Sequence, residues 1–224
     1  MTSGAIRVLL VDDDALVRTG LRLMLGGAPR LEVVGEAADG ADVADAVARL
    51  RPDVVLMDVR MPLLDGIAAT RNITSHAGHR PAVIVLTTFD ADATVVEALR
   101  AGAAGFLVKH TPPERIVDAV HRAAAGEPVL SPTVARALMD RVAAGADAPV
   151  DARRRRARER FALLTERERQ VARAVAAGLS NAEIAGRLFM SVGSVKAHIS
   201  SALTRLDMTN RIQLALLAHD ADDE

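Results

Sequence analysis

The chain has 224 residues, half of them apolar and a quarter charged, a composition that excludes an intrinsically disordered protein and allows one large domain or two small ones. It has no cysteine, which excludes a disulfide framework and thiol chemistry. No apolar run approaches the roughly 20 residues of a membrane span, and the N-terminal segment has no basic region of a signal peptide, so we expect a cytoplasmic protein with no membrane contact.

Charge is distributed unevenly along the chain. Residues 1–125 carry 13 Lys and Arg against 16 Asp and Glu, a net charge of −3. Residues 150–219 carry 13 against 6, a net charge of +7. Opposite charges in the two parts suggest two domains with different partners, and a basic domain is typical of nucleic-acid binding.

Five short β-branched segments in the first half alternate with five helical patterns. Strands are expected at residues 6–11, 31–37, 53–57, 82–87 and 104–108. Helices are expected at residues 15–25, 41–50, 66–73, 92–102 and 113–126. This alternation predicts an α/β domain over residues 1–126, in which a parallel sheet has helices on both faces.

The rest of the chain has a different pattern. Residues 127–160 are expected to be a linker with one helical stretch near 132–143 and six arginines between positions 153 and 160. Residues 161–224 carry helical patterns and an acidic tail but no strand signal, and they are expected to form a small all-α domain.

Polar residues stand where the predicted strands end. Asp12 and Asp13 follow the first strand, Asp58 the third, Thr87 the fourth and Lys109 the fifth. Ligands of open parallel sheets bind at this edge. Because clustered carboxylates repel one another, they need a cation, and oxygen ligands suit Mg²⁺. An aspartate beside a metal and a lysine suits phosphoryl transfer, with Lys109 neutralising the phosphoryl oxygens and Thr87 donating a hydrogen bond to one of them.

These residues carry a family resemblance. Two aspartates after the first strand, D-x-x-M-P-x-x-x-G from position 58, and the later Thr and Lys recur in order over residues 6–125. The segment resembles the receiver domain of two-component response regulators. The resemblance implies a five-stranded, flavodoxin-like parallel sheet of order 2-1-3-4-5. It also implies that Asp58 is the phosphoacceptor and that Asp12 and Asp13 form an acidic pocket. Mg²⁺ would bind Asp13, Asp58 and the backbone carbonyl of Arg60.

The same resemblance assigns a conformational switch to Thr87 and Phe106, although Phe106 also suits a plain core position. Thr88 is the less favoured alternative to Thr87. Many receivers have a proline with a cis peptide bond directly after the lysine. This chain has His110 there, so no cis bond is expected.

Three other polar residues of the first half have simpler interpretations than a role in this site. Asp14 suits the N-cap of the first helix. His76 and His79 flank an Ala-Gly pair, and with no further ligand beside them they are interpreted as solvated loop residues rather than a metal site.

The basic end has the signals of short, tightly connected helices. Thr165 with Glu168, and Ser180 with Glu183, form capping boxes, and Gly178 suits the end of the first helix. A second helix is expected at 181–188, a third at about 192–206 after a Ser191 cap, and a fourth at about 210–219. This order resembles a helix-turn-helix. Its core positions would be Val171, Val175, Ile184, Ala185, Leu188, Val195, Ile199 and Leu203.

A longer motif makes that resemblance specific. The pattern L-T-x-R-E, G-x-S-N-x-E-I-A and L-x-x-S-x-x-S-V-K-x-H-I resembles the LuxR-type DNA-binding domain over residues 163–219. The whole chain therefore resembles a NarL/FixJ-class response regulator. By this resemblance Lys196, Ala197 and Ser200 face base edges in the major groove of double-stranded promoter DNA, and Ser194 and His198 face phosphates. Some members carry a basic residue where Ser200 stands, so the base preference stays open.

Two further features keep alternatives. The arginines 153–156 suit phosphate contacts or, preferably, a solvated face. The apolar side of the fourth helix, with Ile212, Leu216 and Leu217, suits either core packing or a dimer contact.

The resemblance implies a phosphorylation-controlled transcriptional regulator and not an enzyme. A sensor histidine kinase would phosphorylate Asp58 with Mg²⁺ as cofactor, and the protein would then bind DNA as a homodimer. One rival hypothesis is an aspartyl-phosphate phosphatase, because residues 12–14 contain D-x-D at a strand end. Another is a DNA-binding protein that needs no phosphorylation, against which the acidic cluster argues.

Overall fold

The structure is a computed structural model that describes residues 4–75, 79–87, 92–130 and 150–222. The chain divides into two compact units, Met1–Leu138 and Met139–Glu224, and each is described by itself. Among the described residues, no helix has the length and apolar character needed to cross a membrane.

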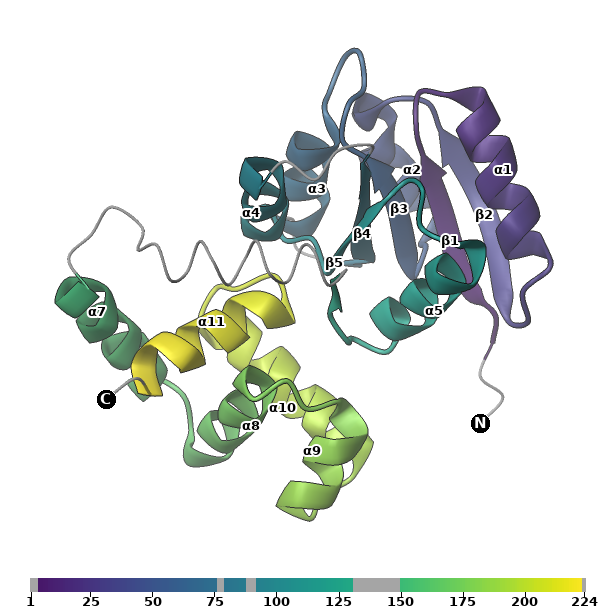
Figure 1. Cartoon of the computed structure of the whole chain (residues 1–224). Coiled ribbons are helices and arrows are strands. Elements are labelled where there is room, and N and C mark those ends of the chain that lie inside the picture. The colour runs from purple at the N-terminus through teal and green to yellow at the C-terminus, as the bar shows by residue number, and fades with distance from the viewer. Residues whose placement is uncertain (1–3, 76–78, 88–91, 131–149, 223–224) are drawn as a thin grey trace. The chain divides into compact units, whose positions relative to one another are not determined.

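The first unit is built around a parallel sheet (Figure 1). The strands lie in the order β2-β1-β3-β4-β5-β6. Their bounds are β1 Ile6–Val11, β2 Leu31–Ala37, β3 Val54–Asp58, β4 Ala82–Thr87, β5 Gly105–Val108 and β6 Val129–Leu130. All five pairings are parallel. The predicted order 2-1-3-4-5 is therefore confirmed, with one additional strand at the β5 edge.

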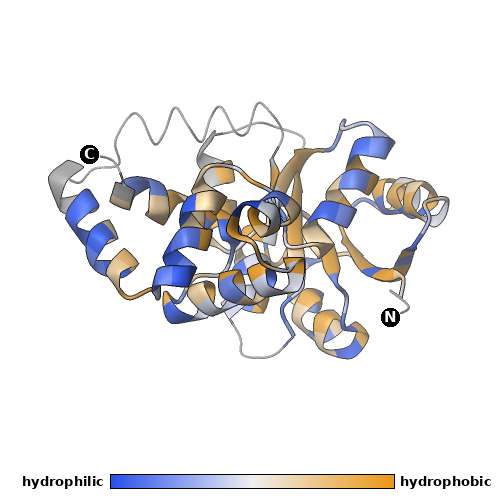
Figure 2. Ribbon diagram, turned by 90° about the horizontal axis from the view of Figure 1, so that it is seen from below, coloured by the Kyte–Doolittle hydropathy of each residue, from blue (hydrophilic) through white to orange (hydrophobic). Residues whose placement is uncertain are grey.

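Helices cover both faces of this sheet. Their bounds are α1 Ala15–Gly26, α2 Val43–Leu50, α3 Gly66–Ser75, α4 Asp92–Arg100 and α5 Pro113–Ala124, with a short 3₁₀ helix at Gly40–Asp42 before α2. One core cluster joins α1 and α5 to the strands, and α3 packs against α2 and α4. Figure 2 shows that the strands are hydrophobic along most of their length, as strands covered on both faces are.

The second unit is helical. Its helices are α7 Val150–Ala162, α8 Glu166–Ala176, α9 Asn181–Leu188, α10 Val192–Arg205 and α11 Arg211–Asp222. They share one buried cluster, in which Val171, Ile184 and Val195 are almost fully shielded from solvent. This cluster contains most of the core positions predicted from the sequence, while Leu188 and Leu203 are partly buried at its margin.

The segment expected to be a linker has more structure than its composition suggests. Val129 and Leu130 form β6 and pair with β5. Arginines 153–156 lie in α7, whose Ala157 and Phe161 are buried in the core of the second unit. The helical stretch expected near 132–143 lies outside the described residues.

Candidate functional site

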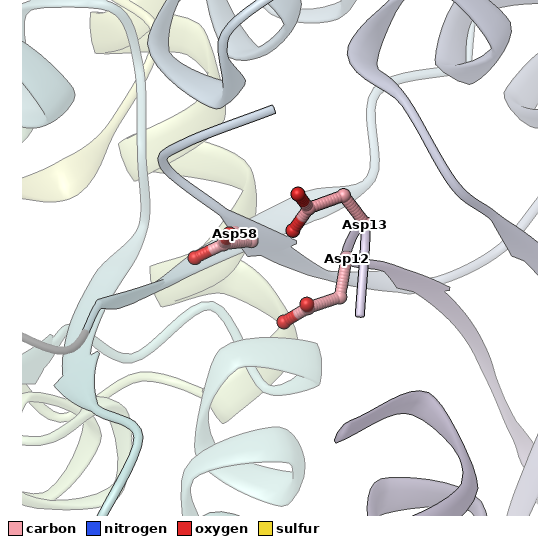
Figure 3. A group of neighbouring side chains, drawn as sticks. All are labelled: Asp12, Asp13 and Asp58. Carbon is pink, nitrogen blue, oxygen red and sulfur yellow. The ribbon is translucent and has the colours of Figure 1, made fainter. Parts of the chain in front are cut away.

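Three aspartates meet at the carboxyl edge of the sheet (Figure 3). Asp12 and Asp13 directly follow β1, and Asp58 ends the neighbouring strand β3. One carboxylate oxygen from each lies within 4.8 Å of those of the other two. Asp12 and Asp58 are buried, whereas Asp13 is exposed. The topology therefore brings the three predicted residues together and leaves the cluster open to solvent on the Asp13 side.

Lys109, just after β5, supplies the positive charge of this cluster. Its Nζ lies 2.6 Å from Asp12 Oδ2 and 3.1 Å from Asp58 Oδ1. Burial raises the pKa of Asp58, and the charge of Asp12 raises it further, against the lowering effect of Lys109. Burial acts to lower the pKa of Lys109, but hydrogen bonds and charge from Asp12 and Asp58 outweigh it, and the net shift is upward. Lys109 therefore stays protonated, while burial and the charge of Asp12 disfavour the ionised form of Asp58.

The carboxylates present fit a hard divalent cation. Asp12 Oδ2 is fully buried and lies 2.6 Å from the Lys109 ammonium, which also contacts Asp58. This ammonium offsets one of the three carboxylate charges, and the remaining like charges repel one another unless a further cation binds. The three residues offer oxygen ligands only, which Mg²⁺ prefers, and the exposed side leaves room for the waters that Mg²⁺ retains.

The loop after Asp58 is held by backbone packing and by a carboxylate that the sequence did not single out. A Cβ on Gly66, the first residue of α3, would lie 1.8 Å from the carbonyl oxygen of Asp58, so only glycine allows the loop to close. Asp39 accepts hydrogen bonds from the backbone N–H groups of Leu63 and Leu64 at 2.8 and 3.0 Å. The loop that contains Arg60 is thereby tied to the end of β2.

The two expected switch residues lie on neighbouring strands. Thr87 ends β4 and is buried, and Phe106 in β5 is fully buried. The carbonyl of Thr87 accepts a hydrogen bond from the backbone N–H of Lys109 at 2.7 Å. As expected, the described residues contain no cis peptide bond, His110 included.

Asp14 and His79 were both given simpler interpretations than a role in this site. Asp14 caps α1, since its carboxylate accepts from the Leu16 backbone N–H, as predicted. The phosphatase hypothesis needs this second acid of D-x-D for chemistry, whereas here it is committed to the helix. His79 is not merely solvated, because its Nε2 lies 2.5 Å from the carbonyl of Pro52. Thr88 and His76 lie outside the described residues.

In the second unit, helix α10 has two distinct faces. Val195, Ile199 and Ala202 are buried against the unit's core. On the other side are the predicted DNA-facing residues, with Lys196, Ala197 and Ser200 exposed and Ser194 and His198 half-buried. Both predicted capping boxes are formed, and Ser191 caps α10 through its hydrogen bond from the Ser194 N–H.

Two buried polar side chains, Glu168 and Arg211, hold α10 and α11 in place, and the sequence showed only part of their contacts. Glu168, predicted as a cap, also accepts from the Ser201 hydroxyl at 2.6 Å. Arg211 on α11 donates to Asn181 Oδ1 at 2.5 Å and to the Leu179 carbonyl. These contacts join helices that are distant in sequence, so helical periodicity alone does not reveal them.

Burial bears on one of the two remaining alternatives, the role of the apolar side of α11. Ile212 and Leu217 on α11 are buried within the unit, and Leu216 is half-buried, so this side of α11 is core. Arg155 and Arg156 on α7 are exposed, which suits both a solvated face and phosphate contacts.

The two units together define a class of protein that joins a parallel α/β fold with an acidic cluster to a helix-turn-helix. Residues 8–121 match the family model of the response regulator receiver domain, and residues 162–218 match the model of bacterial regulatory proteins of the luxR family. The chain belongs to the response regulators, as a transcriptional regulator of the NarL/FixJ class.

Proteins that match over nearly the whole chain support this assignment. The chain is 38% identical over 214 residues to the transcriptional regulatory protein LiaR of Bacillus subtilis, which covers 96% of this chain and 97% of LiaR. It is 37% identical over 211 residues to the nitrate/nitrite response regulator protein NarP of Escherichia coli, covering 94% and 93%. The crystal structure of the response regulator ChrA matches with a TM-score of 0.53 and 36% identity over 96% of this chain and 97% of that one. LiaR is thus a transcriptional regulatory protein, and NarP and ChrA are response regulators.

Proposed function

We propose that Asp58 accepts a phosphoryl group from a sensor histidine kinase in a Mg²⁺-dependent reaction, and that the phosphorylated protein binds promoter DNA as a homodimer. The observation that carries this proposal is the position of Asp58. Its carboxylate is buried at a strand end, 3.1 Å from the Lys109 ammonium, with an oxygen within 4.8 Å of oxygens of Asp12 and Asp13.

The chemistry follows from this geometry. A carboxylate oxygen of Asp58 attacks phosphorus, an O–P bond forms, and the N–P bond of the kinase phosphohistidine breaks with its imidazole leaving. The raised pKa of Asp58 marks a carboxylate whose charge is poorly solvated and hence available for this attack. Lys109 would follow the negative charge onto the phosphoryl oxygens. When bound to Asp12, Asp13, Asp58 and the Arg60 carbonyl, Mg²⁺ would neutralise the same oxygens.

The signal would leave the cluster through β4 and β5. Thr87 and Phe106 lie on these paired strands, where a hydroxyl can bond a new phosphoryl oxygen and a buried ring can change its packing. Phosphorylation would shift an existing equilibrium toward the form that binds DNA. The exposed residues Lys196, Ala197 and Ser200 would then read base edges, while Ser194 and His198 would contact phosphates.

The test is DNA footprinting with the full chain, with and without acetyl phosphate in Mg²⁺. Wild-type protein should protect a specific site at a lower concentration after treatment, and Asp58→Asn should show no such gain. Thr87→Ala should be labelled yet respond weakly, which separates acceptance of the phosphoryl group from the response to it. An equal gain in Asp58→Asn and wild type would contradict the proposal.

A further inference from the structure

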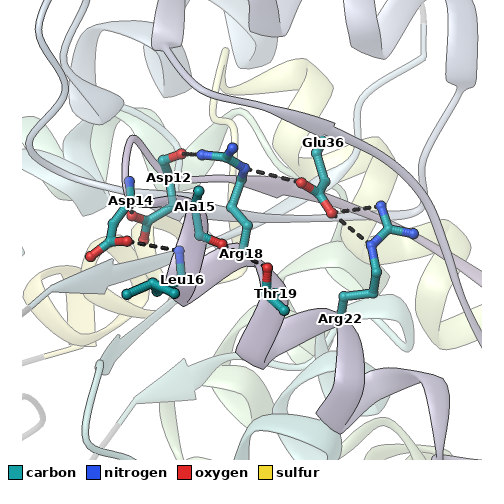
Figure 4. Close-up of polar contacts among 8 residues, drawn as sticks. All are labelled: Asp12, Asp14, Ala15, Leu16, Arg18, Thr19, Arg22 and Glu36. Atoms are coloured by element: carbon teal, nitrogen blue, oxygen red, sulfur yellow. Dashed lines mark hydrogen bonds and ion pairs between the residues drawn. The ribbon is translucent and has the colours of Figure 1, made fainter.

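An arginine outside the proposed chemistry holds the backbone of the acidic cluster (Figure 4). Arg18 on α1 donates from Nη1 to the carbonyl oxygen of Asp12 at 2.6 Å and from Nε to Glu36 on β2 at 3.0 Å. Arg22, one turn further along α1, donates to the other oxygen of the Glu36 carboxylate at 2.7 Å. Glu36 therefore lies between two guanidinium groups, and only Arg18 reaches the cluster.

The contact is well protected. The Arg18 side chain is 16% exposed, whereas that of Arg22 is 51% exposed. The hydrogen bond from Arg22, together with that from Arg18, lowers the pKa of Glu36 against the effect of burial, so the carboxylate that anchors Arg18 is ionised at neutral pH. An ionised anchor fixes the guanidinium, whose planar fork can bond the carboxylate and the carbonyl at once.

The held carbonyl matters because of the residue that follows it. The carbonyl of Asp12 and the N–H of Asp13 belong to one planar peptide unit. The Asp12 side chain has its own holders, the Asp14 N–H at 3.0 Å and Lys109. For the exposed Asp13 carboxylate, the described part of the chain provides no hydrogen bond or ion pair. Its direction toward Asp58 is therefore set by the orientation of the peptide that Arg18 holds.

We propose that Arg18 is a positioning residue for the Mg²⁺ site, which keeps the Asp12–Asp13 peptide oriented so that Asp13 faces Asp58 before the metal arrives. This inference rests on the proposed function, because it presupposes that the cluster binds Mg²⁺. Residues behind metal ligands commonly act in this way, and their loss typically lowers metal affinity about 10–100-fold.

Charge and positioning predict opposite results when Arg18 is removed. A cation near three carboxylates opposes the binding of a second cation, so a pure charge effect would make Mg²⁺ bind more tightly in Arg18→Ala. Loss of positioning would make it bind more weakly. Arg22→Ala is the matched control, since it removes the same charge from the same helix and the same Glu36 partner without a contact to Asp12.

The experiment is calorimetric titration of the full, unphosphorylated chain with Mg²⁺ alone. Arg18→Ala should bind about tenfold or more weakly than wild type. Arg22→Ala should stay within about twofold of it, because it leaves every ligand-supporting contact in place. Arg18→Lys should fall between wild type and Arg18→Ala, because one ammonium keeps the charge but cannot replace the fork. Melting temperatures in EDTA establish that each variant is folded.

The outcomes separate this inference from the proposed function. If wild type binds no Mg²⁺, the proposed function fails, and the role of Arg18 fails with it. If wild type binds Mg²⁺ and Arg18→Ala binds as tightly as Arg22→Ala, or more tightly than wild type, only the positioning role is overturned. If Arg18→Ala does not fold, Arg18→Lys against Arg22→Lys decides by the same criterion.

Discussion

Two buried carboxylates, one in each unit, have opposite surroundings. Glu168 in the helical unit accepts from the Thr165 backbone N–H at 2.8 Å and from the Ser201 hydroxyl at 2.6 Å. Burial acts to raise the pKa of Glu168, but these hydrogen bonds outweigh it and the net shift is downward. At Asp58 in the receiver unit burial prevails, and the pKa is raised despite Lys109.

Under the proposed function, the difference separates a structural carboxylate from one that meets a ligand. Glu168 has its lone pairs satisfied by the protein, so its charge stabilises the packing of α8 against α10. Asp58 is held beside the like-charged Asp12, an arrangement that costs stability and is relieved by a cation or by reaction. Each unit also has one lysine. The chain has two, with Lys109 in the acidic cluster and Lys196 exposed on α10.

Removing the charge of Glu168 tests the structural half of this comparison. Glu168→Gln should lower the free energy of unfolding of the helical unit by roughly 1–3 kcal/mol, because its amide places a donor against the donors that the carboxylate satisfied. Glu166→Gln is the control, since Glu166 is exposed on the same helix and should cost no more than about 0.5 kcal/mol. Calorimetry measures both, and equal losses would remove the distinction.

The loss in Glu168→Gln should also depend on pH. The folded pKa of Glu168 lies below its ordinary value of 4.5, so its stabilisation is complete above that value and is lost as the pH falls through the folded pKa. The stability difference between wild type and Glu168→Gln should therefore shrink in acid. A difference that stays constant from pH 7 to strongly acidic solution would contradict the assignment.

Lys196 tests whether the exposed lysine reads DNA. Lys196→Ala should weaken binding to the specific site by roughly 1–3 kcal/mol and reduce discrimination between sites. Arg156→Ala, which removes an exposed charge from α7, is the matched control. If Arg156 touches phosphate, its loss should weaken all sequences alike and make the salt dependence shallower by about one unit. Unchanged affinity and preference in Lys196→Ala would mean that α10 is not the recognition helix.

For Asp58, the comparison predicts that removing the charge raises the stability of the receiver unit. The folded pKa of Asp58 lies above its ordinary value of 3.8, so protonated Asp58 favours folding in acid, and this contribution is lost as the pH rises through the folded pKa. Asp58→Asn should therefore stabilise the receiver unit at pH 7 by roughly 0.5–2 kcal/mol, with a smaller gain near pH 4. Asp118→Asn, an exposed position on α5, should change stability little. A loss of stability in Asp58→Asn at pH 7 would show that its charge is already satisfied.

The sequence predicted those parts of the molecule that depend on local pattern. Polar residues after apolar runs marked Asp12, Asp58 and Lys109, because parallel strands end at one edge whatever their order. The capping boxes were equally visible, since their partners lie three residues apart.

The parts that the sequence did not show depend on contacts between distant segments. The bond from Arg18 to the Asp12 carbonyl joins a side chain to a backbone atom, which leaves no residue-type signal. Strand β6 has two residues, too few for an alternating pattern. Helix α7 carries a run of arginines that suggested a linker, yet its Ala157 and Phe161 are buried in the core of the unit.

The most direct test of the central claim is the intact mass of the protein after treatment with acetyl phosphate. Wild type should gain one phosphoryl group in Mg²⁺ and none in EDTA, because Asp58 needs the cation that Asp12 and Asp13 would hold. Asp58→Asn should gain none under either condition, while Asp118→Asn should be labelled as wild type is. Equal labelling of wild type in EDTA, or full labelling of Asp58→Asn, would contradict the account.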